Sequence, residues 1–253
     1  MDLSLQKANA WKRISAFLLD AILTAILAIA AGLVMSIILR YDSYAQRMEE
    51  LYAFYEEQYD TSFDQTEESY KALPEEEKAK FDAAYSALTS NPEALALYQR
   101  VVAYTFLIVT TGLLAAFLIL EFAVPLWLGE GRTLGKKIFG LAVMRTDHVR
   151  VNGVILFVRA VLGKFTLETM IPVYVLIMLM FNTIGIVGGI ALIVLAVTQL
   201  IILVTSGTGA VLHDKLASTI VVDMATQRIF NTPEEMLEAK KTAAAEKAKR
   251  AEW

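Results

Sequence analysis

The chain has 253 residues, of which 56% are hydrophobic and 20% are charged, with a formal net charge of −4 and a mean hydropathy of +0.50. Its apolar residues gather into four long blocks, which excludes an ordinary soluble domain or a disordered chain and indicates a polytopic membrane protein. With no cysteine and two histidines, the chain lacks a thiolate nucleophile and has too few ligands for a histidine-built metal centre.

The first apolar block, residues 14–39, is long enough to span a membrane. Its 26 residues contain one charge, Asp20, and at a rise of ~1.5 Å per residue they exceed the ~30 Å hydrocarbon core. Arg13 precedes Asp20 by two helical turns, so both side chains project from nearly one face. Because a carboxyl at membrane depth normally faces a partner or a wet cavity, Asp20 is either a functional site or an ion-pair partner that locks helix packing.

The same block has some features of a cleaved signal peptide. Lys7, Lys12 and Arg13 form a basic segment before it, and Ala28-Ile29-Ala30 imitates a cleavage site. The apolar block continues past that site and carries a carboxylate, so we favour a retained membrane helix.

Residues 41–100 form an acidic insert with fourteen Asp and Glu against five Lys and Arg. Aromatic residues from Tyr41 to Tyr59 recur at three- and four-residue steps, which predicts a helix that continues the first block. Further helices are predicted to begin at Pro74 and at Asn91-Pro92-Glu93. The net charge of −9 favours a solvated face, and a protein partner at residues 41–100 is the alternative.

The second block, residues 101–128, carries Glu121, and Pro125 follows one turn later. Because proline has no N–H, the carbonyl of Glu121 loses its helical hydrogen bond, and we expect a kink beside the carboxylate. Glu121 is therefore either a contact for an ion or substrate, or a buried partner of Arg159 or Lys164.

Residues 129–153 form a basic connection that begins GEGRTLGKKIFGLAV. It resembles a phosphate-binding loop only superficially, because Glu130 and Lys137 replace the first glycine and the hydroxyl residue of that motif. We reject nucleotide binding and expect contact with anionic lipid headgroups. Residues 141–145 and 149–151 flank a turn and predict a short hairpin.

The third block, at about 154–181, is interrupted by charges in its first half. The residues after Glu168 are too few to span alone, so a crossing must begin near Arg159. This places Lys164 and Glu168 inside the membrane, where they are predicted to form an i,i+4 pair.

The fourth block, residues 185–206, follows a turn predicted at 182–184. Its small and amide side chains are expected to pack against other helices, together with a small residue of the first block. The packing candidates are Gly32, Gly188, Gly189 and Gln199.

Residues 207–253 contain LHDKLASTIVV, in which 218–222 is a candidate strand that pairs with 141–145. A histidine-aspartate hydrolase site is excluded because further His and Asp ligands are missing. Thr232 to Glu235 form a capping box that predicts a final helix, polar all round.

Basic residues in the connections predict the orientation. There are three Lys and Arg in residues 1–13, five in 129–153 and seven in 207–253, so both termini are expected to be cytoplasmic after four crossings. We therefore predict an all-α integral membrane protein with a helical extracytoplasmic insert and a small cytoplasmic β element. The predicted parts are the N-terminus with the first transmembrane helix (1–40), the insert (41–100), the second transmembrane helix (101–128), the basic cytoplasmic loop (129–153), the third and fourth helices as a hairpin (154–206) and the cytoplasmic tail (207–253).

Several motifs together resemble the RDD family of bacterial membrane proteins. They are RISAFLLD with Arg13 and Asp20, GRTLGKKIFGLAV at 131–143, Arg159, and LHDKLASTIVV at 212–222. The family is named for one arginine and two aspartates, and Arg13, Asp20 and Asp214 match these positions. The resemblance implies a multi-pass protein of the bacterial plasma membrane, with transport of unidentified ligands suggested for the family and sodium-proton exchange for some members. It implies no role for residues 41–100.

Two classes of function remain open. A transporter or ion exchanger, coupled to protons or sodium, would use an inner-leaflet cluster of charges, and four helices are few for a pathway, so this class implies a homo-oligomer. A non-enzymatic scaffold or assembly factor would use the same charges for packing and recruit partners through the insert and tail. We expect no catalytic residue, metal, cofactor or nucleic-acid partner, and the candidate transport residues are Arg13, Asp20, Glu121, Arg159, Lys164, Glu168 and Asp214.

Overall fold

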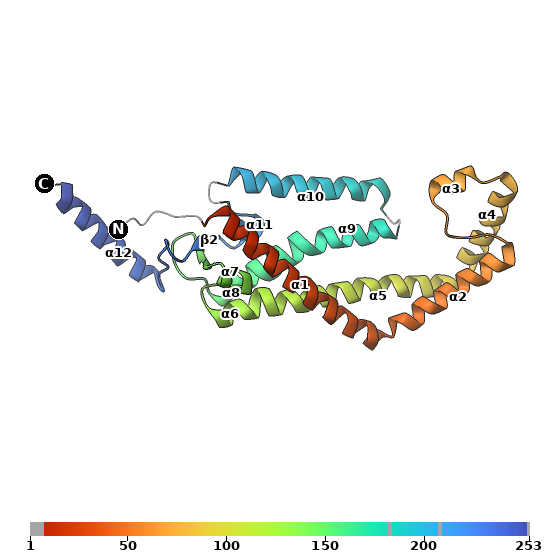
Figure 1. The fold of residues 1–253 in the computed structure, drawn as a ribbon, viewed down its shortest axis with the longest axis horizontal. Helices are drawn as coiled ribbons and strands as arrows, with labels where there is room; N and C mark the ends of the chain where they lie inside the picture. The colour runs from red at the N-terminus through yellow and green to blue at the C-terminus, as the bar shows by residue number, and fades with distance from the viewer. Residues whose placement is uncertain (1–7, 182–183, 207–208, 252–253) are drawn as a thin grey trace. The chain divides into compact units, whose positions relative to one another are not determined.

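The computed structural model describes residues 8–181, 184–206 and 209–251, most of which are helical (Figure 1). The chain divides into two compact units. The first comprises Met1–Ala31 and Gly112–Trp253, and the second comprises Gly32–Thr111.

Three helices in the described ranges are long and apolar enough to cross a membrane, namely Ala10–Leu39, Pro92–Leu128 and Gly185–Ile202. The first of these is α1. Its buried side chains within the first unit are Ala16, Asp20 and Thr24, which recur every four residues and so form one narrow face. The remaining apolar surface of the helix is exposed, as expected where lipid is the solvent.

The second span consists of α5 (Pro92–Phe117), η1 (Leu118–Ala123) and α6 (Val124–Leu128). η1 is a π-helical turn in which the N–H of Val124 donates to the carbonyl of Ile119, five residues back. The helix before Pro125 thus contains a π-turn, which absorbs the missing proline donor by shifting the hydrogen-bond register, and the expected kink stays a prediction. Glu121 lies within this turn and is buried.

The third apolar block is a helical run of α8 (Gly153–Phe157), η2 (Val158–Met170) and α9 (Ile171–Met180). η2 is a π-helix, and the N–H of Ile171 donates to the carbonyl of Thr166, five residues back. α10 (Gly185–Thr205) packs beside α9 (Figure 1). Of the turn predicted at 182–184, residues 182 and 183 lie outside the described residues.

A two-stranded antiparallel sheet joins distant parts of the first unit. β1 (Leu141–Arg145) pairs with β2 (Thr219–Asp223), with Val143 opposite Val221. Both faces of this ribbon are buried, which explains its nearly continuous apolar sequence. The segments expected to pair thus do so, whereas the predicted hairpin with 149–151 is reduced to one bridge between Met144 and Arg150. The short helices α7 (Leu134–Ile138) and α11 (Leu212–Leu216) precede β1 and β2, respectively.

The second unit contains α2 (Tyr41–Tyr59), α3 (Glu67–Ala72), α4 (Glu75–Ser90) and the beginning of α5. α2 does not continue α1 as one unbroken helix, because Arg40 between them adopts a left-handed conformation with φ 53°. α3 was not predicted. α5 begins where the sequence indicated, since the Asn91 side chain accepts a 2.8 Å hydrogen bond from the N–H of Glu93.

The C-terminal helix α12 (Pro233–Ala251) also begins at its predicted cap. The hydroxyl of Thr232 accepts a 3.2 Å hydrogen bond from the N–H of Glu235, whose carboxylate accepts from the N–H of Asn231 at 2.9 Å. These bonds satisfy backbone donors that a helix N-terminus otherwise leaves unpaired.

Candidate functional site

A charged cavity

The first unit contains a cavity of about 590 Å³. It is lined by polar side chains from five helices, namely α1, α7, η2, α10 and α11. Apolar side chains of α1 and of the sheet complete the lining. Six of the seven charged residues singled out in the sequence lie on its wall, namely Arg13, Asp20, Arg159, Lys164, Glu168 and Asp214. The seventh, Glu121, contacts Lys164. The fold thus gathers charges that are as many as 201 residues apart, from Arg13 to Asp214, around one space.

Asp20 and the start of α7

Asp20 is held by the N-terminus of α7. Its Oδ1 accepts a 2.7 Å hydrogen bond from the N–H of Gly135, and its Oδ2 accepts from the hydroxyl of Thr133. Lys136 Nζ lies 3.6 Å from the same Oδ2. Backbone N–H groups at the start of a helix have no partner within that helix. The Asp20 carboxylate therefore caps α7, although it belongs to a distant helix, α1.

Gly135 is required by this approach. A Cβ at this position would overlap the carbonyl oxygen of Ala16 and lie 2.9 Å from the Asp20 carboxyl carbon. Ala16 and Asp20 are one turn apart on the buried face of α1, so α7 rests directly on that face. Only glycine allows the backbone to come this close.

Lys136 is buried rather than presented to solvent, with 7% of its surface exposed. Burial, together with the nearby Lys164 ammonium, lowers the pKa of Lys136 to about 8. Its Nζ donates to the Thr133 hydroxyl at 3.0 Å. Lys136 is therefore unavailable to the lipid headgroups expected at this loop, although Lys137 and Arg150 are exposed.

The Asp214–Arg159–His213–Glu168 path

Asp214 and Arg159 form a buried ion pair between α11 and η2. Arg159 Nη1 also donates to the hydroxyl of Thr219 at 2.9 Å, and that hydroxyl lies 3.1 Å from Asp214 Oδ1. Asp214 is 1% exposed, so its charge depends on these partners.

His213 extends the network to Glu168. Its ring Nε2 lies 3.0 Å from Arg159 Nη2, and its Nδ1 lies 2.8 Å from Glu168 Oε2. Because a guanidinium can only donate, Nε2 must accept and Nδ1 must carry the proton, which defines a neutral tautomer. Burial and the Arg159 charge agree with this assignment, since they hold the pKa of His213 well below its usual range.

Glycine again permits the close contact. A Cβ at Gly163 of η2 would lie 2.5 Å from the His213 Cβ and 2.9 Å from its Cα. The N–H of His213 also donates to Glu168 at 2.9 Å. Both the backbone and the side chain of His213 thus hold α11 against η2.

The remaining candidates

Lys164 does not form the predicted i,i+4 pair with Glu168. Its Nζ lies 2.6 Å from Glu121 Oε2, and both side chains are largely buried. Glu168 instead accepts from His213. The tertiary partners prevail because each offers a buried, charge-assisted hydrogen bond, whereas a neighbouring pair on one helix contributes only ~0.2–0.5 kcal/mol.

Arg13 reaches the segment that leads to α11. Its Nη2 donates to the carbonyl of Gly209 at 2.6 Å. Gly209 has φ +65°, and a Cβ there would lie 2.5 Å from the guanidinium, so glycine suits this position on both counts.

The expected packing residues divide into different environments. Gln199 lines the cavity instead of serving only a helix interface. In the second unit, a Cβ at Gly32 would lie 3.5 Å from the side chain of Ile108, an ordinary contact distance. Gly188 approaches Leu179 of α9, whereas a Cβ at Gly189 would meet no atom of the described chain within 4 Å.

Family membership

The RDD family model matches residues 7–218. The chain belongs to the RDD family. Searches of curated proteins and of solved structures give no match. The matched range includes Arg13, Asp20 and Asp214, and all three line the cavity of this RDD protein.

Sequence reasoning missed several residues of the RDD site. The sequence places Thr133, Gly135 and Lys136 in a basic connection that contacts headgroups, although Thr followed by a helix-forming segment is a recognisable cap signal. His213 was considered only as a metal ligand. No local pattern could have shown that it bridges Arg159 and Glu168, because that contact depends on the packing of α11 against η2.

Proposed function

We propose that this RDD family protein transports a small polar ligand or ion through the charged cavity, with coupling to protons, and that it has no enzymatic activity. The observation that carries the proposal is the continuous path of Asp214, Arg159, His213 and Glu168 along the cavity wall. Two of these groups, His213 and Glu168, are of residue types that can take up and release a proton, and they share a 2.8 Å hydrogen bond.

Protons suit this arrangement better than a metal cation. Hard cations such as Ca²⁺ require six or more oxygen ligands around one point, and sodium likewise binds to several oxygens. Both oxygens of Asp20 and of Asp214, and Oε2 of Glu121, already accept from nitrogen or hydroxyl donors, and Glu168 accepts from His213. A proton needs only one oxygen, and a Glu168 oxygen, at the end of the path, would take it up by giving up a hydrogen bond from His213.

The proposal includes the topology inferred from the basic residues. The run of α8, η2 and α9 forms a fourth crossing, in which Lys164 is neutralised by Glu121 and Arg159 by Asp214, while Glu168 accepts hydrogen bonds from His213. Both termini lie in the cytoplasm of a bacterial cell, and the exposed Lys137 and Arg150 face anionic headgroups. Since few helices enclose the cavity, the functional form is a homo-oligomer.

The test is proton flux in proteoliposomes, measured with an internal pH-sensitive dye under an imposed sodium or pH gradient. Glu168→Gln retains an acceptor for His213 but cannot carry a proton, so flux should fall about 100-fold. Asp223→Asn is the matched control, because Asp223 pairs with Lys12 at 2.6 Å and does not line the cavity. Normal flux in a folded Glu168→Gln protein would refute the coupling role.

A scaffold is the second candidate function. It is favoured by the pairing of Asp20, Glu121, Glu168 and Asp214 with donors in the resting structure, which is also what a static packing network requires. The same liposomes separate the two functions. A wild-type protein that folds and inserts but moves no protons under either gradient would favour the scaffold, as would a loss of cellular function on deleting 41–100 or the tail.

A further inference from the structure

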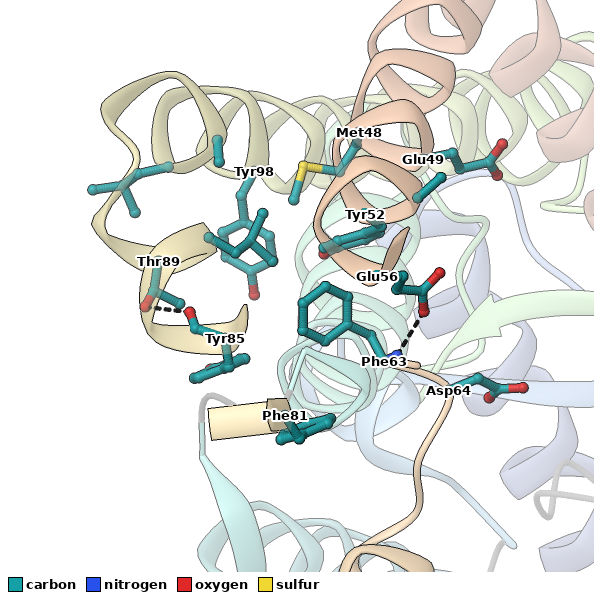
Figure 2. A pocket seen from close by; sticks show the side chains of 14 residues that line it. Met48, Glu49, Tyr52, Glu56, Phe63, Asp64, Phe81, Tyr85, Thr89 and Tyr98 are labelled. Carbon is teal, nitrogen blue, oxygen red and sulfur yellow. Dashed lines mark hydrogen bonds between the residues drawn. The ribbon is translucent and has the colours of Figure 1, made fainter. Parts of the chain in front are cut away.

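The second unit contains a groove of about 770 Å³ that neither the charged cavity nor the family motifs involve. It lies between α2, α4 and the beginning of α5, and the loop after α2 closes one side. Figure 2 shows aromatic side chains from these segments directed into the same space. Its volume is within the ~300–1,000 Å³ typical of small-molecule sites.

Five aromatic rings line this groove. Tyr52 contacts Phe63 with ring centroids 5.8 Å apart, Phe63 contacts Phe81 at 5.8 Å, and Phe81 stacks on Tyr85 at 6.2 Å. Tyr98 of α5 completes the set. Phe81 and Tyr85 are one turn apart on α4, so helical periodicity brings both rings to one face.

The loop ring is positioned by a defined hydrogen bond. The N–H of Phe63 donates to Glu56 Oε1 at 2.6 Å, as the dashed line in Figure 2 shows. This bond ties the loop to α2 and holds the Phe63 ring between Tyr52 and Phe81. The groove is therefore shaped before any ligand enters.

The charges around the rings are all of one sign. Glu49, Glu56 and Asp64 line the groove, and no Lys, Arg or His is among its described lining residues. Carboxylates and the negative faces of aromatic rings both attract positive charge. An anion would meet repulsion from the carboxylates on the side of α2 and the loop after it, and a small metal ion would gain nothing from the apolar wall.

We propose that this groove binds an organic cation with an apolar body, of the quaternary ammonium class. The apolar part would cover the exposed side chain of Leu95, and the cationic centre would lie over a ring face beside the carboxylates. A tightly hydrated cation such as sodium has no apolar surface that could pack against this lining. The inference concerns the second unit and does not depend on transport through the charged cavity.

The test uses the full chain in nanodiscs of zwitterionic lipid, with isothermal titration calorimetry at low salt. The probes are benzyltrimethylammonium, the neutral benzyl alcohol and the anionic benzenesulfonate, which share one ring and differ in charge, and empty nanodiscs correct for partitioning. We expect saturable binding of the cation, about tenfold tighter than that of either other probe. Equal binding of all three probes would show a general apolar groove, and absence of saturable cation binding would show no site. Either result overturns the proposal.

Variants locate the binding. Phe81→Leu keeps an apolar side chain but removes a ring, and Tyr85→Leu does the same at a side chain that is 55% exposed and so tolerates change. Each should weaken cation binding about three- to tenfold without affecting benzyl alcohol. Phe54→Leu is the matched control, since Phe54 is on α2, is 58% exposed and does not line the groove. Unchanged cation affinity in folded Phe81→Leu and Tyr85→Leu proteins, with folding checked by circular dichroism, would overturn the assignment.

Discussion

The contact between α1 and α7 predicts that Gly135 is among the least replaceable residues of the chain. In Gly135→Ala, the added methyl would overlap the carbonyl oxygen of Ala16 and lie 2.9 Å from Asp20 Cγ and Oδ1. The Ala16 oxygen belongs to the backbone of a long helix and cannot rotate away. Either α7 moves off α1, or both helices distort.

The cost has two parts. Overpacking a close contact costs ~1–3 kcal/mol. Separation of α7 from α1 also lengthens the 2.7 Å hydrogen bond between the Gly135 N–H and the Asp20 carboxylate, and hydrogen bonds to charged groups contribute ~1.5–3 kcal/mol. Together these terms predict a loss of about 3–5 kcal/mol in the free energy of unfolding, and a fall of about 10 °C in Tm for a chain of this size.

The assay is thermal unfolding in detergent, followed by circular dichroism and by intrinsic tryptophan fluorescence. Gly189→Ala is the control, because a Cβ at Gly189 meets no described atom within 4 Å and the helix α10 favours alanine over glycine. We expect Gly189→Ala to match or exceed the wild-type Tm. If Gly135→Ala unfolds at the same temperature as Gly189→Ala, the close approach of α7 to α1 is wrong.

Three further predictions follow from the first unit and from the topology. Because folding lowers the pKa of His213, the unfolded chain binds more protons than the folded chain below about pH 6.5, so the free energy of unfolding should fall by about 1 kcal/mol from pH 6.5 to 5.5. His213→Gln should reduce this pH dependence in unfolding measurements. An equal pH dependence in both proteins would contradict the neutral tautomer. Lys164→Met should lower the free energy of unfolding by about 3–5 kcal/mol, because the Glu121 carboxylate stays buried without its ammonium partner. Adding Glu121→Leu should restore most of that free energy. Additive effects in the double variant would show that the pair is not coupled. For topology, Ser62→Cys should react with an impermeant thiol reagent from outside intact cells and Ser218→Cys only after permeabilisation, and the reverse pattern would invert the orientation.

Local features were predictable where the chemistry is local. The caps at Asn91 and Thr232 could be recognised because a cap residue and the backbone donors it satisfies lie within three residues of one another. Two short apolar segments predict pairing of 141–145 with 218–222, and the structure pairs 141–145 with 219–223, one residue further along the chain. The break at Arg40 was missed because a left-handed arginine has no strong sequence signal.

The charged residues show where sequence reasoning ended. Lys164 and Glu168 have i,i+4 spacing, which normally predicts a pair, but Lys164 pairs with Glu121, 43 residues away, which confirms one of the two partners that the sequence offered for Glu121. The π-helical turns that carry these residues were also not predicted, although Pro125 indicated a disturbance. A π-helix depends on packing and on neighbouring donors, neither of which is encoded in a short segment.

By itself, the sequence determined that this is a membrane protein, because long apolar blocks cannot remain in water, and that Asp20 must have a partner, because a carboxyl at membrane depth is costly. Only the tertiary structure decided that the partner is the start of α7, 113 residues from Asp20. The physical reason is that the cost of placing a segment or a carboxyl in water or in lipid follows from the residues of that segment alone. Which of several possible donors reaches Asp20 depends on which backbone segments can come close to α1 in the folded chain. Here Gly135 and Gly163 permit that approach for α7 and α11, and these contacts bring the charges to one cavity.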